Sequence, residues 1–164
     1  MQKNIVLIGM PAAGKSTVGV LLAKSMGMPF VDTDLVVQAS TGRLLQEILQ
    51  TDGVTAFLQK EQEIIGACTW TGTVIATGGS MVYSEKVMRN FCENSVVVYL
   101  RLDLPTILTR LTNISTRGIV VEKGQDMVQL YAQRQPLYER YAHVTIDCQD
   151  KNAEQIIAEI MQAC

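Results

Sequence analysis

The sequence is short of positive charge, aromatic residues and histidine. Its 164 residues carry a formal net charge of −2 at pH 7, only 5% of them are aromatic, and there is one histidine. Contacts with backbone phosphates dominate the affinity of proteins for nucleic acids, so a chain without a basic surplus is poorly suited to bind them. We therefore expect no nucleic acid among its partners.

Long apolar runs and closely spaced cysteines are also absent. The first apolar stretch, residues 4–8, is too short for the core of a secretory signal or for a membrane span. Four cysteines stand far apart, without a CxxC pair: Cys68, Cys92, Cys148 and Cys164. We expect them to be reduced thiols rather than metal ligands or disulfide partners, and we expect a cytoplasmic protein that makes no contact with a membrane.

Short β-branched runs alternate with longer stretches of helical periodicity. Strands are expected at Ile5–Ile8, Phe30–Val31, Thr73–Ala76, Ser95–Leu100 and Val144–Ile146. Helices are expected at Lys15–Met26, Asp34–Ser40, Arg43–Leu49, Val54–Thr69, Ser84–Cys92, Leu104–Thr112, Asp126–Tyr141 and Ala153–Met161. Short apolar strands separated by helices indicate a parallel sheet covered on both faces. We predict a single three-layer α/β domain over residues 1–164, with about five strands.

Residues 9–16, GMPAAGKS, match the phosphate-binding pattern G-x-x-x-x-G-K-[ST] between an expected strand and an expected helix. Gly9 and Gly14 allow backbone conformations that other residues avoid, so successive N–H groups of the loop, Ala12 and Ala13 included, can converge on phosphate oxygens. Lys15 is then expected to reach the β- and γ-phosphates, and Ser16 to ligate Mg²⁺. The expected ligands are the phosphates of a nucleotide and Mg²⁺.

Two acidic residues end the second expected strand, in the sequence VDTD. Asp32 and Asp34 lie on one side of an extended segment, at the edge of the sheet where ligands bind. One is expected to hold the Mg²⁺ shell and the other, Asp34, to take a proton from an attacking hydroxyl. The alternative is that Asp32 or Thr33 only caps the next helix.

The third expected strand ends in TGG, and its two glycines allow two interpretations. Gly78 and Gly79 either let a ligand approach the backbone closely or simply form a turn. Next to a phosphate-binding loop, we favour ligand contact.

Arg134 lies on the apolar stripe of the helix expected at 126–141. A guanidinium that faces inward needs a partner, and it suits bidentate binding of a carboxylate or phosphate. The alternative is an internal ion pair. The single histidine, His143, opens a strand without a nearby nucleophile, and we interpret it as structural.

Residues 113–125, NISTRGIVVEKGQ, fit the strand–helix alternation least well. They form either an ordinary surface loop or a lid that closes over the nucleotide and carries Arg117. Arg110 and Arg117 are candidates to neutralise charge on the transferred group, although each would also fit a solvated surface position.

Several motifs occur in order along the chain: GMPAAGKST, DTD, F-x-x-x-E, TGG, a single arginine in 113–125, and RQPLYERYA. Together they resemble the shikimate kinases over essentially the whole chain. The resemblance implies a monomer with a five-stranded parallel sheet, a lid at about 113–125 and an acceptor-binding helical segment at about 33–61. It implies transfer of the γ-phosphate of ATP to a ring hydroxyl of shikimate, with Mg²⁺, in aromatic amino-acid biosynthesis.

The resemblance also implies a role for each matched residue. Contacts to phosphate and Mg²⁺ are implied for Gly14, Lys15, Ser16 and Thr17, with Asp32 in the metal shell and Arg117 as the lid arginine. Contacts to the acceptor are implied for Asp34, Gly78, Gly79 and Arg134, the last with the acceptor's carboxylate. Lys15, Asp34 and Arg117 form the implied catalytic set, and positions 58 and 61 belong to the implied acceptor site.

Most departures from the family pattern fall on the acceptor side. Val54 replaces a glutamate, Leu58 replaces an arginine that grips shikimate, and Ser80 replaces the third glycine of a triplet. The lid pattern R-P-L-L reads R-G-I-V, and Ala12 replaces a glycine in the phosphate-binding loop. The donor side is thus nearly intact, while the acceptor side has changed.

Leu58 has the largest expected consequence among these departures. Losing one charge-assisted hydrogen bond to a carboxylate costs about 1.5–3 kcal/mol, or roughly 10- to 150-fold in affinity. Glu61, one turn further along the helix, loses the arginine that it would have neutralised. The pocket could therefore accept another hydroxylated metabolite, including one that carries an amine. A non-catalytic nucleotide-binding regulator and a nucleoside or nucleotide kinase remain alternatives, although the latter would need aromatic residues to stack a base.

Overall fold

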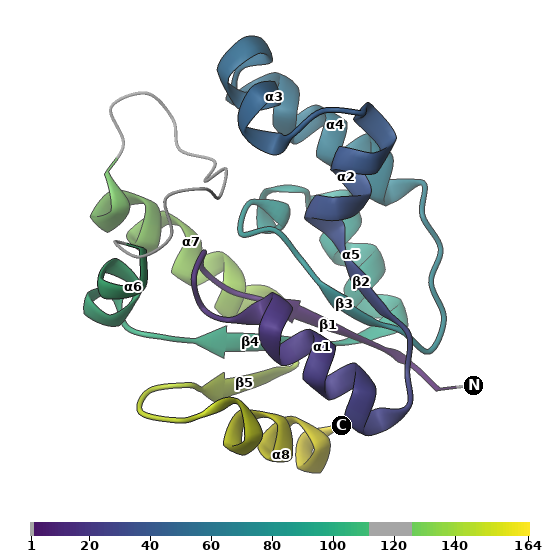
Figure 1. The fold of residues 1–164 in the computed structure, drawn as a ribbon, viewed down its shortest axis with the longest axis vertical. Coiled ribbons are helices and arrows are strands. Elements are labelled where there is room, and N and C mark those ends of the chain that lie inside the picture. Colours follow the sequence, from purple (N-terminus) through teal and green to yellow (C-terminus); the bar gives the residue numbers. More distant parts are fainter. Residues whose placement is uncertain (1, 112–125) are drawn as a thin grey trace.

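The computed structural model describes residues 2–111 and 126–164 (Figure 1). The predicted lid and Arg117 lie outside the described residues. Five strands form one sheet in the order β2-β3-β1-β4-β5, and every neighbouring pair is parallel. The strands are β1 (Asn4–Ile8), β2 (Phe30–Asp32), β3 (Val74–Ala76), β4 (Ser95–Arg101) and β5 (Val144–Asp147).

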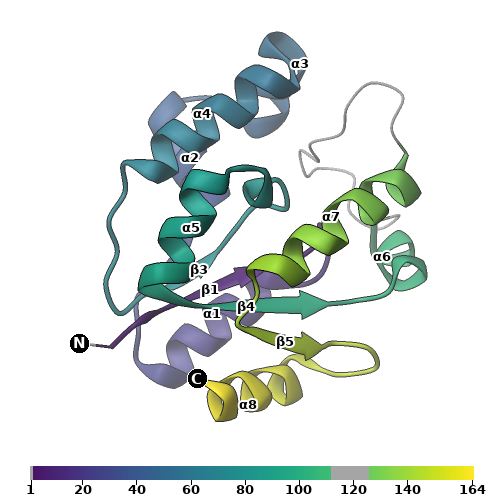
Figure 2. The same cartoon turned by 180° about the vertical axis from the view of Figure 1, so that it is seen from behind.

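Helices lie on both faces of the sheet and beyond one end of it. Helices α1 (Lys15–Met26) and α8 (Ala153–Ala163) cover one face, and α5 (Glu85–Asn94) and α7 (Met127–Tyr141) cover the other (Figures 1 and 2). The remaining helices are α2 (Thr33–Thr41), α3 (Leu45–Asp52), α4 (Val54–Gly66), α6 (Leu104–Leu111) and the short 3₁₀ helix η1 (Met81–Tyr83). The predicted three-layer α/β fold is confirmed.

The central strand β1 shows why the sequence reads as continuous apolar runs rather than alternating ones. All five of its residues are buried, because helices cover both faces of the sheet. Its one polar residue, Asn4, is satisfied: its side chain donates to the carbonyl oxygen of Trp70 (2.8 Å) and accepts from the N–H of Thr73 (3.0 Å). Asn4 thereby fixes the chain that leads into β3.

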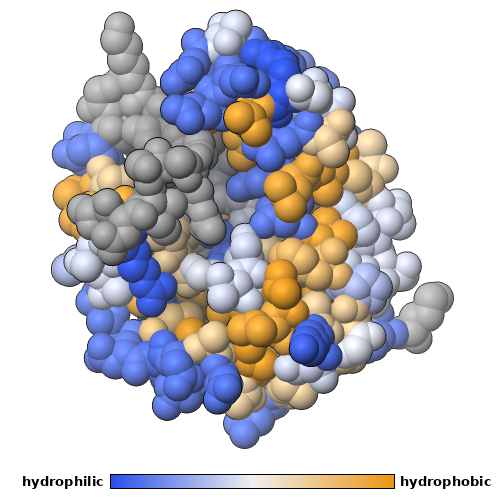
Figure 3. Space-filling view, in the orientation of Figure 1, coloured by the Kyte–Doolittle hydropathy of each residue, from blue (hydrophilic) through white to orange (hydrophobic). Residues whose placement is uncertain are grey.

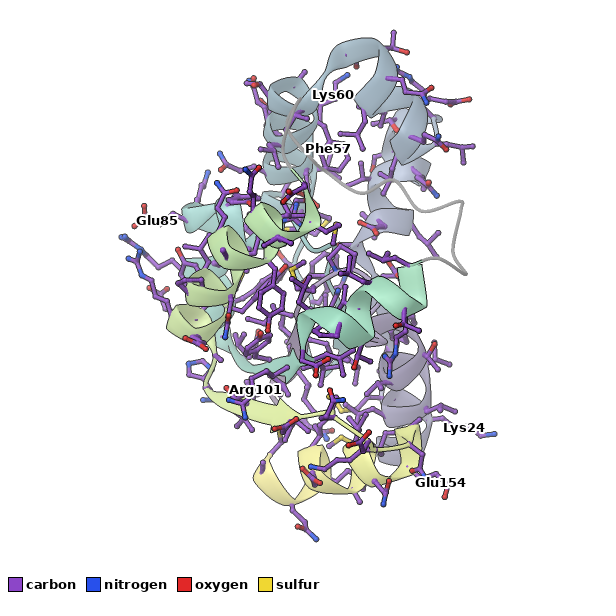
Figure 4. All side chains as sticks on the ribbon, turned by 90° about the vertical axis from the view of Figure 1, so that its left-hand side faces the viewer. Lys24, Phe57, Lys60, Glu85, Arg101 and Glu154 are labelled. Carbon is purple, nitrogen blue, oxygen red and sulfur yellow. The ribbon has the colours of Figure 1, made fainter. Side chains whose placement is uncertain are left out.

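Helices α2, α3 and α4 pack on one another in a unit at the end of the molecule where β2 and β3 finish (Figure 1). Figure 4 shows Phe57 and Lys60 of α4 in this unit, with Lys24 and Glu154 pointing outward at the opposite end. Phe57 is buried, whereas Lys60 forms an ion pair with Asp52, which also pairs with Arg43. Helix α4 ends at Gly66, three residues before its predicted end, because the chain turns there toward β3.

The outer surface carries a few large apolar side chains. Figure 3 shows a mostly hydrophilic surface over α3 and apolar residues lower on the same face. On α1, Val20 and Leu21 are 49% and 40% exposed. Within the described ranges, no helix has the length and apolar character needed to cross a membrane.

His143 has the structural place expected of it. Its Nδ1 accepts a hydrogen bond from the N–H of Val97 (3.0 Å), and its own N–H donates to the carbonyl oxygen of Val97 (2.8 Å). The residue thus joins the start of β5 to β4. The four cysteines are free thiols.

Candidate active site

The loop between β1 and α1 has the conformation that phosphate binding requires. Gly9 has φ = 149°, and a Cβ there would lie 2.8 Å from the carbonyl oxygen of Leu100, so only glycine fits. Gly14 has φ = 93° and precedes α1 without a side-chain cap. The first N–H groups of α1 are therefore open to an anion at the positive end of the helix.

Ala12 occupies a left-handed position in the same loop, with φ = 65°. This conformation costs a residue with a Cβ about 1–2 kcal/mol, which explains why a glycine is usual there. The loop keeps its shape despite the alanine. Nη1 of Arg110 donates a hydrogen bond to the carbonyl oxygen of Ala12 (3.1 Å). The backbone N–H of Ala13 donates to the carbonyl oxygen of Met10 (3.1 Å).

Lys15 lies across its own loop. Its side chain is buried, and its Nζ donates to the carbonyl oxygens of Gly9 (2.7 Å) and Met10 (2.8 Å). These contacts hold the ammonium against the backbone of the phosphate-binding loop. Thr17, two residues on, is exposed in the first turn of α1.

Asp32 combines both interpretations made from the sequence. One oxygen, Oδ1, accepts the N–H of Asp34 (3.0 Å) and caps α2. The other, Oδ2, accepts a hydrogen bond from Oγ of Ser16 (2.7 Å). Capping therefore leaves one carboxylate oxygen beside the serine hydroxyl of the phosphate-binding loop.

These two oxygens fit Mg²⁺. Magnesium in nucleotide sites is bound by one or two protein oxygens, with phosphate and water oxygens completing its octahedron. Ser16 and Asp32 would supply a hydroxyl and a carboxylate of the required kind. No cluster of three or more His, Cys, Asp or Glu side chains that could hold a metal occurs among residues 2–111 and 126–164.

Gly78 and Gly79 lie where side chains of the acceptor side meet the backbone. A Cβ on Gly78 would lie 2.5 Å from Oδ1 of Asp34 and 3.2 Å from Oε1 of Glu61. A Cβ on Gly79 would lie 2.8 Å from Nη1 of Arg134 and 3.0 Å from Cδ of Pro11 in the phosphate-binding loop. The glycines thus make room for the acidic and basic side chains, a reason that the sequence did not reveal.

Arg134 faces inward, as predicted. It is 1% exposed, its Nε donates to the hydroxyl of Tyr83 (3.2 Å), and its Cζ lies 5.2 Å from the centre of that ring. One turn further along α7, the hydroxyl of Tyr138 donates to the carbonyl oxygen of Gly79 (2.8 Å). Helix α7 is therefore fastened to the glycine turn one helical turn beyond the guanidinium.

Glu61 has an unusual environment for a carboxyl group. It is 2% exposed, and its Oε2 accepts a hydrogen bond from Oγ of Ser80 (2.9 Å). Burial, with a smaller contribution from the negative charge of Asp34, raises the pKa of Glu61 to about 8, although the Ser80 hydrogen bond and the Arg134 charge oppose the shift. Ser80 was noted in the sequence only as a departure from a glycine triplet; its contact with Glu61 was missed.

The structure thus brings together, from separate segments, most of the residues singled out in the sequence. A phosphate-binding loop, an acidic pair at the end of β2 and a buried arginine beside the β3 turn define a small P-loop kinase. Leu58 is partly buried on α4 and supplies no charge to this site.

Comparisons with known proteins specify the family. The shikimate kinase family model matches residues 11–164, and the chain belongs to the shikimate kinase family. It is 34% identical over 160 residues to the shikimate kinase of a Sulfurihydrogenibium species, covering 97% of this chain and 96% of the relative. It is 36% identical over 163 residues to the shikimate kinase of Thermodesulfovibrio yellowstonii, a match that covers 98% of this chain and 94% of the relative.

A solved structure agrees with these relatives. The shikimate kinase of Acinetobacter baumannii, determined in complex with shikimate, superposes with a TM-score of 0.90 at 30% identity. The match covers 99% of this chain and 93% of that one. Members of this family are phosphotransferases that act on an alcohol group and use ATP with Mg²⁺.

Proposed function

We propose that this protein transfers the γ-phosphate of ATP to a ring hydroxyl of shikimate, giving shikimate 3-phosphate and ADP. The main support for this proposal is that Asp34 and Arg134 both lie against the turn at Gly78 and Gly79. The same turn lies against Pro11 of the phosphate-binding loop. Donor and acceptor would therefore meet across this turn. Family membership supports the same acceptor.

The donor side is assigned to the loop and its surroundings. The N–H groups at the start of α1 and the ammonium of Lys15 would bind the β- and γ-phosphates, with Arg110 supporting the loop through Ala12. Ser16 and Asp32 would hold Mg²⁺, which neutralises phosphate charge when bound.

The acceptor side is assigned to Asp34 and Arg134. Arg134 would bind the acceptor's carboxylate with its planar fork of donors. Asp34 would accept the hydrogen bond of the attacking hydroxyl and take its proton. The hydroxyl oxygen forms a bond to the γ-phosphorus, the bond from that phosphorus to the β–γ bridging oxygen breaks, and ADP leaves with the electron pair.

The wider setting follows from this assignment as part of the same proposal. We place the protein in the cytoplasm, as a monomer in aromatic amino-acid biosynthesis. Its expected partners are ATP and a small hydroxylated acid.

A coupled assay of ADP release tests the proposed reaction at saturating ATP and Mg²⁺. Shikimate is compared with quinate, with the primary amide of shikimate and with an amino alcohol. We expect shikimate to have the highest kcat/KM. A better rate with the amino alcohol would instead favour the amine-bearing acceptor suggested by Leu58, and absence of turnover with every acceptor would favour a nucleotide-binding regulator.

A further inference from the structure

The face of α4 that carries Leu58 borders a cavity of about 250 Å³. Leu58, Glu61, Ser80 and Tyr83 are among its lining residues. Leu58 and Glu61 are three positions apart, so they share one face of the helix. The next cation along the helix, Lys60, lies on another face and pairs with Asp52. Helix α4 therefore presents Glu61 to the cavity without a cation of its own beside it.

Ser80 fixes the orientation of the Glu61 carboxyl group. The serine hydroxyl donates to Oε2, so Oε2 is the accepting oxygen of the pair. The other oxygen, Oε1, is buried and has no hydrogen-bond partner within the part of the chain that the structure describes. Oε1 lies on the side of Gly78 that also faces Oδ1 of Asp34. A buried oxygen that lacks a partner is costly, and a ligand at this turn would satisfy it.

Among residues 2–111 and 126–164, the charged and titratable groups around Glu61 come from three elements. Asp34 of α2 contributes a negative charge, Arg134 of α7 a positive one, and Tyr83 of η1 lines the same cavity. The acidic and basic residues of α5 line a neighbouring hollow, which shares Gln62 and Tyr83 with this cavity. The charge of Asp34 raises the pKa of Glu61 and the charge of Arg134 lowers it, so the two act in opposite directions. The burial of the carboxyl group therefore has the largest effect, and burial favours the neutral form of Glu61.

We infer that Glu61 is a neutral carboxylic acid whose Oε1–H donates a hydrogen bond to an oxygen of the acceptor, held in that orientation by Ser80. The inference deepens the proposed function and rests on it for the identity of the acceptor. Leu58 and Ser80 are then a matched pair of replacements. Where the family pattern has an arginine beside Glu61, this chain has a serine that holds Glu61 as the donor.

The inference changes the expectation of an amine-bearing acceptor. An ammonium group would require the ionised form of Glu61, whereas a carboxylic acid donates to oxygens. A carboxylate or hydroxyl oxygen of the acceptor therefore suits the site. When Glu61 ionises, the donor is lost and a negative charge faces the acceptor's carboxylate, so acceptor binding weakens.

The first test follows KM for shikimate from pH 6.5 to 9.5 at saturating ATP. With a midpoint near the pKa of about 8, wild-type KM should rise about tenfold between pH 7 and 9. E61Q, which is neutral at every pH, should lose this rise. The exposed Glu63 provides the matched control, since E63Q should keep the wild-type profile. Turnover of shikimate with no rise in the wild type, or with the same rise in E61Q, overturns the inference.

Ser80 is tested as a positioning residue by the midpoint of the same profile. Its hydrogen bond favours the ionised form of Glu61, so S80A should move the midpoint to higher pH. An unchanged midpoint would overturn the role of Ser80.

A second readout does not depend on the acceptor. Infrared difference spectra between pH 7 and 9 should show a protonated carboxyl C=O band that is present in the wild type and absent from E61Q. Its absence from the wild type overturns the inference even if shikimate is phosphorylated. Its presence in a protein that does not phosphorylate shikimate would support the neutral acid and refute only the proposed acceptor.

Discussion

The donor half and the acceptor half of the site are formed by different kinds of chemical group. The donor half is formed mainly by the backbone of one loop, at Gly9, Ala12 and Gly14, together with the start of α1. The acceptor half is formed by side chains from α2, α4, α7 and the turn after β3, and its four residues Asp34, Glu61, Ser80 and Arg134 span much of the chain. A backbone site depends on conformation, so it tolerates few substitutions. A side-chain site can exchange one charged group for a neutral one if a neighbour changes with it.

Leu58 and Ser80 are an example of such an exchange in the acceptor half. Ala12 is a replacement in the phosphate-binding loop, where the backbone conformation limits which residues fit. The loop accepts a Cβ only at a conformational cost, and its fold is otherwise kept. The acceptor half has lost a cation and gained a hydroxyl that contacts Glu61. The comparison predicts that mutations in the acceptor half change kcat or KM for the acceptor, with little effect on the binding of ATP.

The largest effect is expected from D34N. The amide keeps the size of the side chain but cannot take the proton of the attacking hydroxyl, so kcat should fall by about 10²–10⁴-fold. ATP affinity, measured by calorimetry, should stay within about twofold, because Asp34 acts on the acceptor. E63Q, at an exposed site on α4, provides the control for a lost surface carboxylate. Normal turnover by D34N would remove Asp34 from the chemistry.

R134K should have the next largest effect. Lysine keeps the charge but loses the planar fork that matches a carboxylate, so KM for shikimate should rise roughly 10- to 150-fold. KM for ATP should not change. Arg140 lies on the exposed side of the same helix, and R140K should leave both constants as they are. A rise in KM for ATP alone would place Arg134 in the donor half.

L58R tests whether the acceptor half still accepts the arginine that the family pattern has there. A guanidinium on the same helix face as Glu61 should lower KM for shikimate about tenfold, by adding a charge-assisted hydrogen bond. It should also abolish the rise of KM above pH 8, because a nearby cation favours the ionised form of Glu61. L44R, at a position that is 59% exposed on the surface, is the matched control. A weaker affinity in L58R would show that the site has been rebuilt around leucine.

A12G should have the smallest effect, and it concerns the donor half. Glycine relieves the left-handed conformation at φ = 65°, worth about 1–2 kcal/mol, but it also raises the entropy of the unfolded chain by about 0.4–1 kcal/mol. The difference between these two contributions predicts that the free energy of unfolding rises by about 0–1.6 kcal/mol, as followed by urea denaturation. Lower stability of A12G would mean that the conformation of Ala12 carries no strain.

Most of the fold followed from the sequence, because parallel strands buried on both faces appear as short apolar runs between helices. The phosphate-binding loop of the donor half was equally accessible, since its residues lie together in nine consecutive positions. The C-terminal end of α4 was harder to predict, because the helical apolar spacing continues from Ile64 to Cys68, past Gly66, where the helix ends. The double use of Asp32, as a helix cap and as the partner of Ser16, appeared in the sequence only as two alternatives.

The acceptor half was predicted as a set of residues but not as a set of contacts. Ser80 and Glu61 are 19 positions apart, and only the β3 turn and the packing of α4 bring them together. The positions of Gly78 and Gly79 beneath Asp34 and Arg134 likewise depend on three separate elements. Periodicity identifies which side chains face inward, but it does not identify which inward side chains meet.

The most direct test of the comparison is kcat/KM for shikimate, measured beside the same constant for its primary amide, at saturating ATP and Mg²⁺ and at pH 7. If Arg134 of the acceptor half binds a carboxylate, kcat/KM for shikimate should exceed kcat/KM for the amide roughly 10- to 150-fold. Equal rates with the two acceptors, or a preference for the amide, would contradict the assignment of this half to a carboxylate-bearing acceptor.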